Sequence, residues 1–176
     1  MSIALGERAP DFELPTTGGD RHRLASENPP ATVVYWTCNH CPYAIAWHDR
    51  MLDVARDYAN RGVRTLAINS NDPDKYAADS FEGMAERVES DGGWPHPYLH
   101  DATQEVASMW GAERTPQVYV LDSDLRLHYL GAPDADYDDP SQGAAWRRGA
   151  LDAVLDGREP EPAETEAVGC TIKWRR

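Results

Sequence analysis

The sequence predicts an α/β fold in which a mixed sheet carries helices on both faces. The run ATVVYW at 31–36 is continuous, apolar and rich in β-branched and aromatic residues, which is typical of a strand buried on both faces. Apolar residues then recur at helical spacing from Cys41 to about Arg61, and Gly62 ends this amphipathic helix. A second strand follows at 63–72, and a right-handed crossover through the helix would place it parallel to the first strand.

The rest of the chain alternates between strand-like and helical patterns. Two alternating runs joined by Asp-Ser-Asp predict an antiparallel hairpin, which makes the sheet mixed. These runs lie at 117–121 and 125–130, a small hairpin is expected within 5–20, a short strand at 98–101, and helices at 74–90, 105–110 and about 144–155. We expect one domain over 1–160 and an acidic, proline-bearing tail over 161–176 that packs back on it.

Composition limits the classes of partner. The chain has 176 residues, of which 41% are hydrophobic, and its formal net charge of −13 argues against nucleic acid as a partner. No segment approaches the roughly 18 to 20 apolar residues that a membrane span requires. The N-terminal sequence lacks the pattern of an export signal, so we expect a cytoplasmic protein. The acidic composition fits either a salt-adapted source or an acidic protein from a GC-rich genome.

The stretch YWTCNHCPY at 35–43 holds two of the three cysteines, Cys38 and Cys41, with His40 between them. A structural zinc site usually takes four ligands, and neither a second cysteine pair nor a spaced histidine pair follows, so we expect no metal. A structural disulfide across so short a loop would stabilise little. In a reducing compartment a close cysteine pair is more often catalytic or metal-binding than structural, and with too few metal ligands a redox dithiol is the preferred interpretation.

The position of the pair after a buried strand favours thiol–disulfide exchange. We expect Cys38 to sit where the helix begins, because the free N–H groups of a helix N-terminus stabilise a thiolate. Cys41, one turn further along, would then resolve a mixed disulfide formed on Cys38. His40 would stabilise the Cys38 thiolate further, unless it is an exposed residue without a role.

Three stretches resemble the thioredoxin-like superfamily, and within it the redoxin branch of alkyl hydroperoxide reductase/thiol-specific antioxidant proteins. These are LGERAPDFELPTTGG, TVVYWTCNHCPY and RTPQVYVLDSDLRLHYLG, which together frame residues 5–131. The resemblance implies a three-layer α/β/α sandwich with an N-terminal hairpin extension. It implies that Pro116 is cis and faces the cysteines, and that the backbone of Thr115 docks the substrate. Trp36 matches the aromatic residue before the active site, with core packing as the simpler role.

The resemblance implies a thiol-disulfide oxidoreductase without a cofactor, acting on protein or small-molecule thiols and disulfides. A thiol peroxidase is the alternative. The threonine or serine that peroxiredoxins place three residues before the peroxidatic cysteine is missing, yet Cys41-Pro42 matches their Cys-Pro, and Arg114 could reach the site. The ending VGCTIKW resembles peroxiredoxin-like proteins with a Cys-Asn-His-Cys-Pro motif. Cys170 is either a third redox thiol or, as the sequence favours, a buried apolar residue in a tail anchored by Ile172 and Trp174.

Overall fold

The computed structural model describes residues 2–176 and places a five-stranded sheet at the centre of the molecule. The strands are β3 (Ala31–Trp36), β4 (Arg64–Asn69), β5 (Tyr98–His100), β7 (Gln117–Asp122) and β8 (Leu127–Gly131), in the order β5-β4-β3-β7-β8. β3, β4 and β5 are parallel, whereas β7 and β8 are antiparallel to their neighbours. The expected mixed sheet is thus confirmed, with β3 in its middle.

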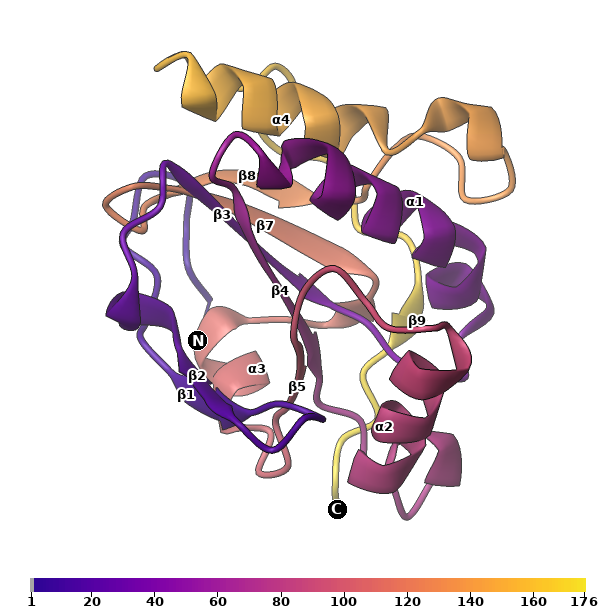
Figure 1. Cartoon of the computed structure of the whole chain (residues 1–176). Helices are drawn as coiled ribbons and strands as arrows, with labels where there is room; N and C mark the ends of the chain where they lie inside the picture. The colour runs from indigo at the N-terminus through magenta and orange to yellow at the C-terminus, as the bar shows by residue number, and fades with distance from the viewer. Residues whose placement is uncertain (1) are drawn as a thin grey trace.

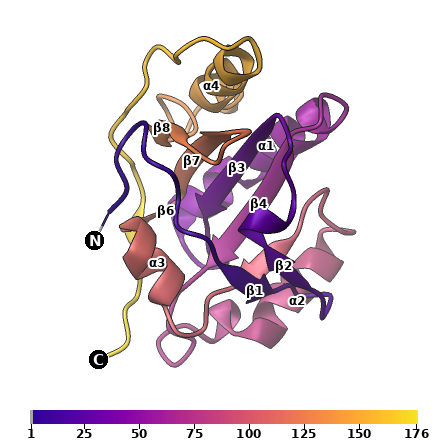
Figure 2. The same ribbon diagram turned by 90° about the vertical axis from the view of Figure 1, so that its left-hand side faces the viewer.

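Helices cover both faces of the sheet (Figure 1). α1 (Pro42–Ala59) and α4 (Ala145–Leu155) pack on one face, and α2 (Phe81–Ser90) lies at the β5 edge. The other face is covered by α3 (Glu105–Trp110) and by the N-terminal segment with its hairpin β1 (Glu13–Pro15) and β2 (Arg21–Arg23), as Figure 2 shows. This is the predicted three-layer α/β/α sandwich with an N-terminal hairpin.

The alternation of side chains along β3 divides the core into two halves. Val34 and Trp36 point into the half beneath α3, and Val33 and Tyr35 into the half beneath α1 and α4. Every residue of β3 is buried, which explains why this strand is apolar at every position except Thr32.

Several boundaries differ from the sequence expectation. The helix expected over 74–90 begins at Phe81, because Ser80 caps its N-terminus by accepting a hydrogen bond from the Gly83 N–H. The helix expected from Cys41 begins at Pro42, because a residue before proline is held in the extended region and proline itself suits the first helical position. The last strand, expected from Leu125, begins at Leu127, because Leu125 adopts a left-handed backbone conformation that closes the turn after Asp122.

The C-terminal segment returns to the domain along the β8 side of the sheet and runs past α3 (Figure 2). Near Glu164 it forms a parallel bridge to Leu130 of β8. Further on, β9 (Cys170–Thr171) pairs antiparallel with β6 (Arg114–Thr115), and Ile172 is buried. Trp174, expected to anchor the tail, is exposed instead.

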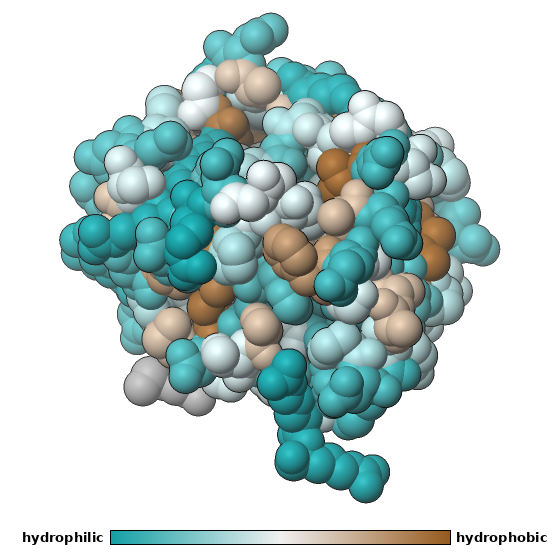
Figure 3. Space-filling view, turned by 60° about the horizontal axis from the view of Figure 1, so that its bottom comes forward, coloured by the Kyte–Doolittle hydropathy of each residue, from teal (hydrophilic) through white to brown (hydrophobic). Residues whose placement is uncertain are grey.

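The face shown in Figure 3 is mostly hydrophilic, and its apolar residues occur as small separate patches. Within residues 2–176 there is no helix that is both long and apolar enough to cross a membrane.

Candidate active site

The cysteine pair lies in the loop that joins the end of β3 to α1. Cys41 is the N-cap of α1, and Pro42 occupies the first turn. The expectation that Cys38 sits where the helix begins is therefore wrong: Cys38 lies three residues earlier, and Cys41 holds the position nearest the free N–H groups of the helix. Both side chains are buried, and all three cysteines are free thiols.

Thr115 contacts both sulfurs from the facing loop. Its hydroxyl lies 3.5 Å from Cys38 Sγ, and its carbonyl oxygen lies 3.3 Å from Cys41 Sγ. The peptide bond between Thr115 and Pro116 is cis, as the resemblance implies. The structure thus brings together the cysteines and the proline loop, which are more than 70 residues apart in the chain.

The surroundings of the two sulfurs favour a thiolate on Cys41. Hydrogen bonds from Cys38 first, and then from the thiol and backbone N–H of Cys170 and the backbone N–H of Ala44, lower the pKa of Cys41 to about 4. The Thr115 carbonyl oxygen accepts a hydrogen bond from a protonated Cys41 and so favours the thiol form. The groups that donate to the Cys41 sulfur have the larger effect, so the net change is a lowered pKa. Burial resists the lowering as well.

Cys38 has the opposite tendency. Its hydrogen bond to Cys41, its burial and the negative charge of Asp79 all raise the pKa of the Cys38 thiol far above its usual range. These surroundings favour a proton on Cys38 and a negative charge on Cys41 in the reduced site. The expectation that Cys38 is the nucleophile and Cys41 the resolving thiol stays a prediction, and these surroundings argue for the opposite order.

Two contacts hold the His40 side chain against the protein, so it is only partly exposed. Its Nδ1 pairs with the carboxylate of Asp79, and its ring stacks on Tyr76 with the ring centroids 3.6 Å apart. Cys38 Sγ, a ring nitrogen of His40 and a carboxylate oxygen of Asp79 lie within 4.8 Å of one another. These three residues offer the atom types that a zinc ion binds, one ligand fewer than a structural site uses.

Asp79 is the functional residue that the sequence analysis missed. It is fully buried in the short 3₁₀ turn Ala77–Asp79 before α2. It accepts hydrogen bonds from the backbone N–H of Asn39 at 2.7 Å and from the side chains of Asn69 and Asn71 at 3.0 and 3.1 Å. The only local signal is the polar stretch SNDPDKYAADS after β4, in which nothing distinguishes Asp79 from its neighbouring aspartates.

Cys170 lies beside the pair, contrary to the interpretation that the sequence favoured. Strand β9 places it opposite Thr115, and it packs against the cluster formed by Cys38, Cys41 and Ala44. It is only half-buried. Pairing between β6 and β9 brings it there, and neither two-residue strand has a sequence pattern long enough to be recognised.

Two other predicted site residues lie away from the sulfurs. Trp36 is fully buried, donates a hydrogen bond to Ser70 Oγ at 3.0 Å and packs against Trp110 and Tyr119, so its role is core packing. Arg114 is exposed and donates to the carbonyl oxygen of Gly169 at 3.2 Å. Its side chain therefore holds the tail. Within residues 2–176 it forms no hydrogen bond with Cys38 or Cys41.

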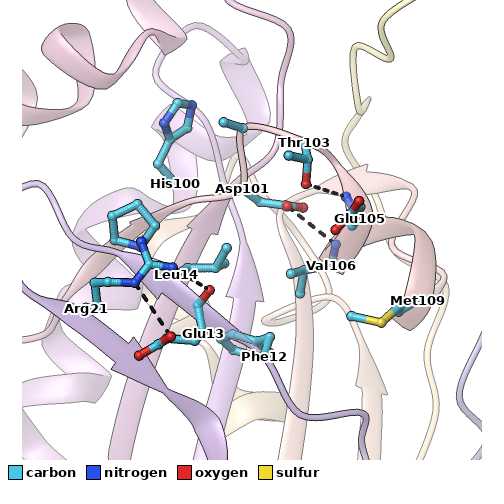
Figure 4. A pocket seen from close by; sticks show the side chains of 12 residues that line it. Phe12, Glu13, Leu14, Arg21, His100, Asp101, Thr103, Glu105, Val106 and Met109 are labelled. Atoms are coloured by element: carbon cyan, nitrogen blue, oxygen red, sulfur yellow. Dashed lines mark hydrogen bonds and ion pairs between the residues drawn. The ribbon is translucent and has the colours of Figure 1, made fainter.

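A hollow of about 450 Å³ lies on the face of the sheet away from α1 and α4, between the N-terminal hairpin and α3 (Figure 4). Arg21, His100 and Met109 are among its lining residues, and none of the cysteines is. The redox site and this hollow are thus separate features of the molecule.

The lowered pKa of Cys41 predicts that a thiolate persists to low pH. Because the thiolate is the charged form, a lowered pKa keeps it at neutral pH and removes it only as the pH falls through about 4. We expect the thiolate absorbance of the reduced protein to correspond to one thiolate per chain at about pH 6, where an ordinary cysteine is protonated. Cys41→Ser should abolish this absorbance and Cys170→Ser should leave it. A wild-type absorbance that arises only above about pH 8 would contradict the prediction.

The central sheet has the strand order β5-β4-β3-β7-β8, and after the end of β3 a pair of free cysteines lies beside a cis-proline loop. This combination is characteristic of thioredoxin-like redox proteins. The exposed lipoprotein thioredoxin Etrx1 of Streptococcus pneumoniae strain TIGR4 shares the fold, with a TM-score of 0.61 at 17% identity over 77% of this chain and 98% of that chain. The profile of the AhpC/TSA family matches residues 5–130. The chain belongs to this family.

The relatives of this chain include proteins named as a thiol-disulfide oxidoreductase and as a putative peroxiredoxin. The thiol-disulfide oxidoreductase ResA of Geobacillus thermodenitrificans (strain NG80-2) is 25% identical over 129 residues, 72% of this chain and 68% of that protein. A Mycobacterium tuberculosis protein (strain CDC 1551 / Oshkosh) named "Putative peroxiredoxin MT2597" is 26% identical over 118 residues, 66% of this chain and 69% of that protein. The crystal structure of an uncharacterized conserved protein from Geobacillus kaustophilus is 39% identical, with a TM-score of 0.90 over 98% of this chain and 93% of that chain. Redox chemistry at thiols is common to the named relatives.

Proposed function

We propose that the chain is a thiol-disulfide oxidoreductase that works through Cys38 and Cys41. One observation carries this proposal: two free, buried cysteines lie beside the cis-proline loop, where Thr115 contacts both sulfurs, and their surroundings drive their pKa values apart. A dithiol with one ready thiolate and one protonated thiol has what disulfide exchange requires. The similarity to ResA supports the same function.

In the proposed reaction the Cys41 thiolate attacks one sulfur of a substrate disulfide. A mixed disulfide forms at Cys41, and the first substrate thiol leaves as a thiolate that takes up a proton. Cys38 then loses its proton and attacks Cys41 Sγ, which releases the second substrate thiol and forms the Cys38–Cys41 disulfide. The substrate is reduced by two electrons and the protein is oxidised by two, and the reverse sequence oxidises a substrate dithiol.

Asp79 and His40 are placed to serve the second step. Cys38 must lose its proton before it attacks, and the carboxylate of Asp79 lies within 4.8 Å of Cys38 Sγ. The negative charges of Asp79 and Cys41 raise the pKa of Cys38 in the resting site, and a mixed disulfide on Cys41 removes the contribution of Cys41, so the pKa of Cys38 falls at the step that needs its thiolate. Asp79 and His40, which are hydrogen-bonded to each other, are both bases within 4.8 Å of Cys38 Sγ.

A thiol peroxidase is the second candidate, and the surroundings of Cys41 favour it. The Cys41 thiolate is held at a helix N-cap by several donors, and Cys38 donates to it from the position where peroxiredoxins carry a hydroxyl. Attack on hydrogen peroxide would give a sulfenic acid on Cys41 and hydroxide, and Cys38 would then expel water and form the disulfide. This candidate agrees with the Cys-Asn-His-Cys-Pro motif and with the similarity to MT2597.

One comparison separates the two functions. The fully reduced protein is mixed with oxidised glutathione in one series and with hydrogen peroxide in another, and thiol loss is followed with free cysteine as the reference. We expect exchange with the disulfide to exceed the reference by up to about thirtyfold, because an ordinary cysteine is only about 3% thiolate at neutral pH. A large excess for peroxide alone would make the peroxidase the leading function. Rates near the reference in both series would remove both proposals.

A further inference from the structure

The C-terminal strand occupies the backbone edge that lies next to the cis-proline loop. Thr115 is paired with Cys170, and Arg114 with Thr171, in the antiparallel ladder of β6 and β9. The Thr115 hydroxyl also approaches the Cys170 carbonyl oxygen at 3.5 Å, and the Ile172 N–H donates to the Glu113 carbonyl oxygen at 2.9 Å. The backbone of Thr115, which the resemblance implies docks the substrate, is thus paired with the chain's own tail.

Gly169 allows this strand to approach so closely. A Cβ atom at Gly169 would lie 2.1 Å from the Thr115 carbonyl oxygen and 2.7 Å from its carbonyl carbon. Both are backbone atoms, so any side chain at this position would push the strand away from the loop. The tail is therefore fitted to the loop at the residue that precedes Cys170.

Cys170 lies next to the thiol pair. It packs against the cluster of Cys38, Cys41 and Ala44, and it is paired with Thr115, whose carbonyl oxygen accepts a hydrogen bond from Cys41 Sγ at 3.3 Å. The tail thus supplies a third thiol at the site, beside the two thiols of the loop after β3. Cys38 and Cys41 are buried, whereas Cys170 is only half-buried.

We propose that Cys170 is a third redox thiol that takes the disulfide over from Cys38 by forming a Cys41–Cys170 bond. This inference rests on the proposed dithiol function of Cys38 and Cys41. The Cys170 thiolate attacks Cys41 Sγ of the Cys38–Cys41 disulfide, the bond between Cys38 and Cys41 breaks, and Cys38 leaves as a thiolate that takes up the proton given up by Cys170. No electrons enter or leave in this step, since one disulfide replaces another.

The pKa of Cys170 depends on whether Cys41 carries a negative charge. In the reduced site, burial and then the hydrogen bond and negative charge of Cys41 raise the pKa of Cys170 to about 11, and Lys173 and Arg114 oppose them. When Cys41 enters a disulfide its negative charge and its hydrogen bond are lost, and the effects of burial and the two cations remain. Cys170 thus becomes a better nucleophile once there is a disulfide for it to attack. The transfer moves the oxidised sulfur from a buried pair to a position that an external reducing thiol can reach.

The first test traps the disulfides that form. Wild type is oxidised with one equivalent of diamide, quenched with acid and an alkylating agent, and digested with trypsin. Cys38 and Cys41 share the tryptic peptide 24–50, and Cys170 lies in the peptide 159–173, so a Cys41–Cys170 bond links two peptides. We expect this linked peptide in wild type, with fragmentation placing the bond on Cys41, and as the main product in Cys38→Ser. Its absence from both proteins would overturn the inference.

A pair of glycine variants separates strand placement from thiol chemistry. Gly169→Ala keeps all three cysteines but forces β9 away from Thr115, and we expect about tenfold less of the linked peptide. Gly149→Ala is the matched control, because a Cβ at this position in α4 meets no atom within 4 Å, and it should behave as wild type. Equal yields of linked peptide from the two variants would show that the bond does not depend on the β6–β9 pairing.

Turnover distinguishes this inference from the proposed function. In Cys170→Ser we expect turnover with dithiothreitol as reductant, divided by the variant's own rate of first reaction with oxidised glutathione, to fall about tenfold below the wild-type ratio. The exposed Thr171→Ser is the control and should change neither rate. Equal turnover in wild type and Cys170→Ser would overturn the third-thiol role alone, whereas a wild type that does not exchange at all would remove the proposed function.

Discussion

Cys41→Ser is expected to lower the rate of disulfide exchange by at least about a thousandfold, because it removes the attacking thiolate. Cys38→Ser should instead retain the first attack and accumulate mixed disulfides, since the thiol that resolves them is missing. The contrast follows from the surroundings of the two sulfurs, which hold the negative charge on Cys41 and the proton on Cys38. Neither serine differs much in size from cysteine, so both variants should fold.

The measurement is the rate of reaction with oxidised glutathione, combined with the intact mass of the protein after rapid acid quenching. A gain of one glutathione on Cys38→Ser, and no gain on Cys41→Ser, is the expected pattern. Because Cys170 can resolve a mixed disulfide on Cys41, the trapping is done with Cys170→Ser present in both variants. The reverse pattern would restore Cys38 as the nucleophile, as the sequence alone predicted, and a loss in neither variant would remove the dithiol mechanism.

Asp79→Ala should cost about 3 kcal/mol of unfolding free energy. The side chain is fully buried and accepts hydrogen bonds from Asn39, Asn69, Asn71 and His40, which lose their partner when the carboxylate is removed. Leaving buried donors unsatisfied costs roughly 1 to 3 kcal/mol, and breaking a buried charged pair costs more. The same network fixes the Cys38–Cys41 loop through the Asn39 backbone, so exchange should slow in the folded variant as well.

Urea denaturation followed by tryptophan fluorescence measures the change in unfolding free energy. Asp74→Ala is the matched control, because Asp74 lies five residues earlier in the same stretch and is exposed. We expect this control to change stability by less than about 0.5 kcal/mol. If Asp79→Ala is as stable as the control, the carboxylate does not hold the loop, and the role given to it in the proposed reaction is lost as well.

The layers of the fold and the dithiol could be predicted because their signals are local. The apolar run of β3, the helical spacing after Pro42 and the alternation in β7 each lie within one short segment. The start of α1 could have been predicted in the same way, since Pro42 favours the first helical position and restricts Cys41 before it. The expectation that Cys38, and not Cys41, lies at the helix N-terminus led to the assignment of the nucleophile to Cys38.

Asp79 and Cys170 could not have been placed from the sequence by such local signals. Cys170 reaches Cys41 only because two two-residue strands pair across the site, and Asp79 reaches His40 across a separation of 39 residues. The sequence by itself determined a mixed α/β sheet and a cysteine pair at the junction of a strand and a helix. Only the tertiary structure indicates which sulfur the surroundings favour as the thiolate, because a thiol pKa depends on the donors and charges that packing brings within a few ångströms.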